Sequence, residues 1–153
     1  MKTILVGYDA SDAAERALDR AAELAEALAA QVVVVSVSTV PVPTPAHLVE
    51  PTGPMLVEAG GTTLTSESQP DLEELAQRRL EQARSRLATR SLDVDYLAEV
   101  GSPAERLLAV ADERDVELIV VGSRDHGIIE RLVAQPVEEA VARRAGRDVL
   151  IVH

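Results

Sequence analysis

The sequence predicts an α/β fold: a doubly wound parallel sheet of five strands with helices on both of its faces. Two observations predict it. Five short apolar runs alternate along the chain with segments whose apolar residues recur every three or four positions, as parallel strands joined by crossover helices require. Runs such as the one at 32–37, which is apolar at every position except Ser36, indicate strands covered on both faces. No repeat or boundary interrupts this order, so we expect a single domain over residues 1–153.

The amino-terminal part of the chain predicts a strand, a helix and a second strand. The apolar run Thr3–Tyr8 predicts a buried strand, and a helix follows from Asp12 to about Ala29, with Ser11 or Asp12 available to cap its start. The run Val32–Val37 predicts the second strand. The apolar residues of the helix fall on one face: Ala14, Ala17, Leu18, Ala21, Leu24, Ala25 and Leu28.

The segment Ser38–Gln69 differs from the rest of the chain. It holds five of the eight prolines and three of the eight glycines, and it shows no helical or strand periodicity. This composition predicts a long loop. Two interpretations remain open for it, a lid or partner-binding flap and plain disorder.

A second amphipathic helix and a strand with one solvent-exposed face follow this loop. The helix is predicted over Asp71–Thr89, and between Leu92 and Val100 apolar residues alternate with polar ones. Alternation leaves one face of a strand wetter, so this strand suits an edge of the sheet. The residues predicted to face inward from the helix are Leu72, Leu75, Ala76, Leu80, Ala83 and Leu87.

The remaining third of the chain predicts two helices and two strands. Ser102-Pro103-Ala104-Glu105 combines a capping box with a proline at the first helical position, which predicts a helix to about Arg114. A buried strand is expected at Leu118–Gly122, a helix at about Val137–Ala145 and a last strand at Val149–His153.

Composition excludes several classes of function. The net charge of −11 repels nucleic-acid backbones and anionic membranes, and with no Phe or Trp and two Tyr the chain has little to stack on bases. The absence of Cys excludes disulfides, thiolate metal sites and a cysteine nucleophile. No apolar run approaches membrane-spanning length and no signal-type segment opens the chain, so we expect a cytoplasmic protein.

The stretch from Val121 to Gly127 is the most informative part of the chain. A buried strand that breaks into a glycine loop can deliver backbone N–H groups to a phosphate. Two residues oppose a phosphate here, because Asp125 adds a like charge and Pro136 removes an N–H at the entrance of the next helix. The spacing Gly122 to Gly127 matches a Walker A loop, but isoleucines stand where that motif needs Lys and Ser or Thr.

In doubly wound sheets, ligands bind beyond the carboxyl ends of the strands, where the strand order reverses. If the first and fourth strands are neighbours, this crevice collects residues 7–9 and 122–127, with Val37 beside them. Asp9 there has two interpretations, turn or helix-cap chemistry and a carboxylate that accepts ribose hydroxyls or holds a cation. A phosphoacceptor role is disfavoured, because it needs a Lys at a later strand end and Lys2 is the only Lys.

The sequence does not predict catalysis or a metal site. Ser123, Asp125 and His126 are near-consecutive loop residues, whereas a triad draws its members from separate segments and needs a nucleophile elbow that is missing here. The three histidines, His47, His126 and His153, are scattered along the chain and do not have the spacing of metal ligands.

The order of elements and four of these segments resemble the universal stress protein family. The opening residues 4–11 are similar to the family's apolar strand followed by Asp-Gly-Ser, with Ala10 in place of the glycine. Val32–Val37 resembles its second strand, and Gly101-Ser102-Pro103 matches its Gly-x-Pro turn. Residues 120–124 and the ending 148–152 complete the likeness.

This resemblance implies a Rossmann-like adenine-nucleotide-binding fold with strand order 3-2-1-4-5, and a homodimer that pairs the last strand, Val149–Val152, across a two-fold axis. Some members bind ATP through Gly-x2-Gly-x9-Gly-Ser/Thr after the fourth strand. Laid on this chain, the motif keeps Gly122 but meets Asp125, Gln135 and Pro136 at the other positions. The resemblance therefore implies a non-enzymatic stress-response or signalling module with weak or absent ATP binding, for which ATP, ADP or AMP remain candidate ligands.

Two alternatives remain. In the first, the chain is a genuine ATP-binding protein that uses Arg124, His126 and Arg131 in place of the glycine cradle. In the second, it is an ATP pyrophosphatase, although the Ser-Gly-Gly-x-Asp loop that such enzymes carry after the first strand is missing here. The candidate nucleotide-binding residues are Gly7, Tyr8, Asp9, Val37, Val121, Gly122, Ser123, Arg124, Gly127, Gln135 and Val137.

Overall fold

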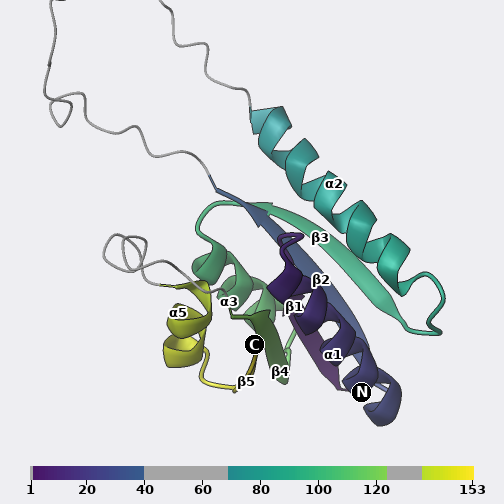
Figure 1. Ribbon diagram of the computed structural model, residues 1–153. Coiled ribbons are helices and arrows are strands. Elements are labelled where there is room, and N and C mark those ends of the chain that lie inside the picture. Colours follow the sequence, from purple (N-terminus) through teal and green to yellow (C-terminus); the bar gives the residue numbers. More distant parts are fainter. Residues whose placement is uncertain (1, 40–68, 124–135) are drawn as a thin grey trace, which may run out of the picture.

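A five-stranded parallel sheet forms the centre of the computed structural model, which describes residues 2–39, 69–123 and 136–153 (Figure 1). The strands lie in the order β3-β2-β1-β4-β5, so the predicted doubly wound sheet and its order are confirmed. The strands are β1 (Thr3–Gly7), β2 (Gln31–Ser38), β3 (Val94–Val100), β4 (Leu118–Gly122) and β5 (Asp148–Val152). The helices are α1 (Asp12–Leu28), α2 (Gln69–Leu87), α3 (Pro103–Glu113) and α5 (Val137–Arg144).

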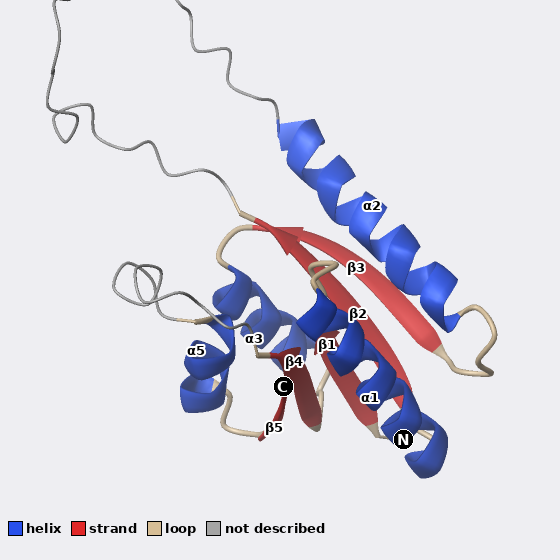
Figure 2. Ribbon diagram, in the orientation of Figure 1, coloured by secondary structure: helices blue, strands red, loops and turns tan. Residues whose placement is uncertain are grey.

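Helices cover both faces of this sheet (Figure 2). Side chains alternate along each strand, so Ile4 and Val6 enter the core under α1 and α2, while Leu5 enters the core under α3 and α5. Val32–Val35 divide in the same way, and all four are at most 1% exposed. The first four valines of β2 are therefore apolar without alternation because both faces of the strand are buried.

Two leucines expected in the core are exposed instead. Leu28 is 48% exposed, because it is the last residue of α1 and the chain reverses directly after it at Ala29, whose φ is 51°. Leu75 is 41% exposed, because it lies one position off the line of buried residues that α2 presents to the sheet. That line runs through Ala76, Leu80, Ala83 and Leu87.

The helix starts follow the predicted signals in part. Ser11, rather than Asp12, caps α1, and its hydroxyl accepts the N–H of Ala14 at 3.1 Å. At α3, Ser102 occupies the cap position before Pro103 but its side chain makes no capping hydrogen bond, so that half of the capping-box prediction is wrong. The backbone holds this start instead, because the N–H of Arg106 donates to the Ser102 carbonyl at 2.9 Å.

Ion pairs join α2 to α1. Arg86 donates to both carboxylate oxygens of Asp19, at 2.9 and 2.7 Å, and to Glu15 at 3.4 Å. Further along, Arg90 pairs with Glu26 at 3.1 Å. The Arg86 guanidinium lowers the pKa of Asp19 through these hydrogen bonds. The pairs hold α2 in a fixed position against its neighbour, which matters below because α2 contributes a residue to the candidate site.

Within the described ranges, no helix combines the length and the apolar character needed to cross a bilayer.

Candidate functional site

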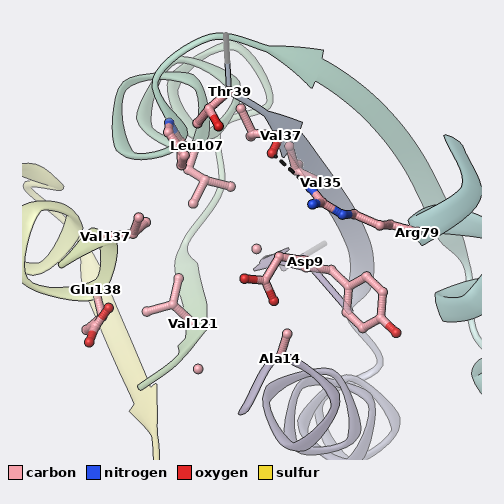
Figure 3. Close-up of a pocket in the computed structure, with 14 residues that line it drawn as sticks. Asp9, Ala14, Val35, Val37, Thr39, Arg79, Leu107, Val121, Val137 and Glu138 are labelled. Carbon is pink, nitrogen blue, oxygen red and sulfur yellow. Dashed lines mark hydrogen bonds between the residues drawn. The ribbon is translucent and has the colours of Figure 1, made fainter. Parts of the chain in front are cut away.

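A cavity of about 230 Å³ lies at the carboxyl ends of the strands, where β1 and β4 are neighbours and the strand order reverses (Figure 3). This is the place where doubly wound sheets bind their ligands, because the connections from adjacent strands diverge to opposite faces there. The walls come from separate parts of the chain: strands β1, β2 and β4 and helices α1, α2, α3 and α5. Only the tertiary fold brings these segments together.

Seven of the eleven candidate residues line this cavity: Gly7, Tyr8, Asp9, Val37, Val121, Gly122 and Val137. Ser123 lies beside it but does not line it, and its backbone N–H donates to the Val152 carbonyl at 2.8 Å. Arg124, Gly127 and Gln135 lie outside the described residues, as do Asp125, His126 and Arg131. Whether the seven bind a nucleotide stays a prediction.

Asp9 combines the two roles that its position suggested. Its Oδ1 accepts the backbone N–H of Ser11 at 3.0 Å, which is turn chemistry at the entrance of α1. Its carboxylate also faces the cavity (Figure 3). A carboxylate has about four acceptor positions, and one that faces a cavity can accept hydroxyl groups of a ligand.

Tyr8 contributes mainly to the core. Its side chain is 3% exposed and packs in the cluster under α1 and α2. Burial raises the pKa of its phenol, and the nearby Glu15 carboxylate raises it further. The phenol therefore stays neutral at physiological pH, and the ring supports the cavity wall from behind.

Gly122 is required by packing. A Cβ built on it would lie 2.4 Å from the carbonyl carbon of Ala13 and 2.8 Å from the N of Ala14, both in the backbone of the first turn of α1. Real Cβ atoms do not approach a backbone this closely. Any side chain here would push α1 away from β4, so the glycine has a structural reason apart from phosphate binding.

Sequence reasoning missed seven lining residues: Ala14, Val35, Thr39, Arg79, Pro103, Leu107 and Glu138. Glu138 follows Val137 on α5, so its position next to a candidate residue was a signal that could have found it. Arg79 gave no such signal, because it lies on α2, far from any motif, and reaches the cavity only through the packing of α2 on the sheet.

The cavity is an apolar cleft with three charged residues in its lining. Val35, Val37, Leu107, Val121 and Val137 supply apolar walls. The charged lining residues are Asp9 and Glu138, both acidic, and Arg79, which is the only cation among the described lining residues. Such a cleft suits a flat, largely apolar ring that carries hydroxyl groups and little negative charge.

A metal centre has no support in the described part of the chain, where no three acidic or histidine side chains gather closely enough to hold an ion.

Comparisons with known proteins show the family of this chain. The model of the universal stress protein family matches residues 1–153. The universal stress protein Rv1636 of Mycobacterium tuberculosis is 32% identical over 152 residues, which cover 99% of this chain and 96% of that protein.

Two solved structures share the fold and contain nucleotides. A universal stress protein in complex with cAMP superposes with a TM-score of 0.72 at 27% identity, covering 99% of this chain and 97% of that one. A universal stress protein from Archaeoglobus fulgidus in complex with dAMP gives a TM-score of 0.65 at 25% identity, covering 100% and 98%. By its sequence over the whole length and by its fold, this chain belongs to the universal stress protein family.

Proposed function

We propose that this chain is a non-enzymatic stress-response or signalling module that binds adenine nucleotides with few phosphates, such as AMP or a cyclic monophosphate, and binds ATP weakly or not at all. The observation that carries the proposal is the composition of the cavity: apolar walls, a carboxylate at the end of β1, and a second carboxylate, Glu138, in the first turn of α5. Two related structures with cAMP and dAMP support the choice of an adenine ligand.

The entrance of α5 argues against a triphosphate. Helix N-termini favour anions through free N–H groups and the helix dipole. Here the cap position is Pro136, which has no N–H, and the first turn carries Glu138 and Glu139. Each lost charge-assisted contact costs about 1.5–3 kcal/mol, so two losses weaken triphosphate binding by about a hundredfold or more.

The nucleoside end of the cavity keeps its binding groups. Asp9 presents a carboxylate that can accept ribose hydroxyls, and Val37 and Val121 can flank a base. Isothermal titration calorimetry with ATP, ADP, AMP and cAMP tests the proposal. We expect AMP and cAMP to bind more tightly than ATP. Submicromolar ATP binding would overturn it in favour of a site in which Arg124, His126 and Arg131 replace the glycine cradle.

A variant that restores the family's ATP motif tests the same reasoning from the opposite direction. Asp125→Gly combined with Pro136→Ser removes a negative charge and returns an N–H and a hydroxyl. We expect ATP affinity to rise by about a hundredfold, the size of two charge-assisted contacts. AMP serves as the internal control, since a general improvement of both ligands would contradict the explanation.

The proposal also covers the oligomeric state, the cellular location and the absence of catalysis. β5 is at the edge of the described sheet and is apolar along Val149–Val152, so pairing with a second copy would cover it. We propose a cytoplasmic homodimer formed this way. Light scattering that gives the mass of one chain would exclude the dimer, and nucleotide hydrolysis above background would exclude a non-enzymatic role.

A further inference from the structure

Arg79 is the charged residue of the cavity that the family motifs do not explain. It lies on α2 and extends across the end of β2 to the cavity (Figure 3). Its Nη1 donates to the backbone carbonyl of Val37 at 3.4 Å. A guanidinium has five N–H donors, so this long bond leaves donors available to a ligand.

The Val37 carbonyl is available to Arg79 because β2 is longer than β1. The two strands pair up to Val35 opposite Gly7, and the N–H of Tyr8 then donates to the Val35 carbonyl at 2.9 Å. Carbonyls two residues apart on a strand point to the same side. The Val37 carbonyl therefore points past the end of β1, and it forms a polar pair with Arg79 at an otherwise apolar end of the cavity.

The packing of α2 holds Arg79 in this position. The residue lies three positions after Ala76 and four before Ala83, so it borders the helix face that is buried on the sheet. Arg86, two turns further along α2, is tied to Asp19 of α1 by the ion pair described above. Arg79 thus starts from a fixed helix, and only its own side chain must be ordered when a ligand binds.

Arg79 and the anion-repelling end of the cavity lie apart. Glu138 and Arg79 are on opposite sides of the cavity in Figure 3. Val35 and Val37, which can pack on a flat ring, are on the side of the Val37–Arg79 pair, while Leu107 faces them from α3. A nucleotide whose base occupies this apolar end brings the edge of the base, rather than its phosphate, to the guanidinium.

We propose that Arg79 is a specificity-determining residue that donates a hydrogen bond to N1 or N7 of the bound purine base, the ring nitrogens away from the ribose. This inference rests on the proposed function, because it assumes an adenine ligand in this cavity. It adds a base contact from α2, a segment outside the glycine motif and the strand ends. Purine ring nitrogens accept hydrogen bonds in the plane of the ring, which a planar guanidinium at the ring edge can donate.

Two variants and two ligand analogues test the inference. Arg79→Gln removes the charge and the fork, and Arg78→Gln is the matched control, because Arg78 is the preceding residue, is 73% exposed and pairs with Glu74 on the same helix. Calorimetry measures the affinities of adenosine, AMP, 1-deazaadenosine and 7-deazaadenosine, each analogue lacking one ring nitrogen. Thermal unfolding by circular dichroism establishes that both variants fold.

We expect Arg79→Gln to weaken adenosine and AMP by the same factor, about tenfold, and Arg78→Gln to change neither. The wild-type protein should bind one of the two deaza analogues about tenfold more weakly than adenosine, and Arg79→Gln should abolish that difference. Equal wild-type affinities would refute the inference even if Arg79→Gln does not fold.

Three results would overturn the inference. Equal wild-type affinity for all three nucleosides would show that neither N1 nor N7 is contacted. Loss of AMP but not adenosine in Arg79→Gln would place the guanidinium on the phosphate, and unchanged binding in that variant would remove its role. In each case the wild-type protein still binds nucleotide and the proposed function stands; a wild-type protein that binds no adenosine or adenine nucleotide would overturn both.

Discussion

The contact between Gly122 and the first turn of α1 predicts a large effect of a single methyl group. In Gly122→Ala, the new Cβ would lie 2.4 Å from the Ala13 carbonyl carbon and 2.5 Å from its oxygen. These atoms belong to a helix backbone buried on the sheet and cannot rotate away. The helix or the end of β4 must shift to admit the methyl group.

The magnitude follows from two opposing terms. Overpacking that moves backbone costs about 1–3 kcal/mol. Replacing glycine returns about 0.4–1 kcal/mol, because alanine restricts the unfolded chain, and φ at residue 122 is not in the left-handed region, so alanine adopts it without strain. We expect Gly122→Ala to lower the free energy of unfolding by about 1–2 kcal/mol.

Gly7→Ala is the matched control. Gly7 ends the neighbouring strand and lines the same cavity, but the nearest atom to its added Cβ would be Cδ1 of Leu107, at 3.1 Å. This is the end of a side chain and can move by a few tenths of an ångström, so we expect Gly7→Ala to change stability by less than about 1 kcal/mol.

Urea unfolding followed by far-ultraviolet circular dichroism measures both variants, since the chain has no Trp to report by fluorescence. Equal stability of Gly122→Ala and Gly7→Ala would refute the reasoning. It would mean that the first turn of α1 yields to a methyl group at no cost, and the glycine would then need a ligand-based explanation.

Two further predictions concern stability. Ala29 caps the end of α1 at φ 51°, so Ala29→Gly should stabilise the protein by about 0.5–1 kcal/mol, because relief of about 1–2 kcal/mol of backbone strain exceeds the entropy cost of the glycine. Ala27→Gly is the control at an exposed helical position of α1 and should destabilise the protein by about 1 kcal/mol. Thermal unfolding that gives both changes the same sign would contradict this. Arg86 lowers the pKa of Asp19 in the folded state, so the ion pair stabilises above the ordinary aspartate pKa of about 3.9 and this contribution is lost as the pH falls through the lower folded value. Asp19→Asn should therefore be less stable than the wild type near pH 7, by under about 1 kcal/mol because the pair is partly exposed, with the difference in urea midpoint vanishing in acid; a difference that persists there would exclude the ion pair as its cause.

Local patterns in the sequence predicted the elements because each pattern has a local physical cause. The apolar run at Val32–Val37, which only Ser36 interrupts, predicted a strand buried on both faces, and β2 lies inside the sheet between β3 and β1. The start of α1 at Ser11 followed from the short-range bond between its hydroxyl and the N–H of Ala14. Errors arose at the end of a helix, as at Leu28, and at the border of its buried face, as at Leu75.

The candidate site divides along the same line. Asp9, Val37 and Val121 stand at strand ends, and a parallel sheet gathers its strand ends at one edge, so alternation of strands and helices together with family resemblance predicted their meeting. Arg79 and Leu107 reach the cavity from the middle of two helices. Neither lies near a motif, so no sequence pattern indicated their place in the site.

The sequence by itself determined the order of strands and helices, which residues face a core, and the acidic, proline-bearing replacement of a phosphate-binding motif, since periodicity, charge and backbone restriction act over a few neighbouring residues. Only the tertiary structure decided that Arg79 lies over the end of β2, that Glu138 lines the cavity and that Gly122 is a glycine because α1 leaves no space for a Cβ. Those three facts depend on how helices pack on the sheet, and packing joins residues that are far apart along the chain.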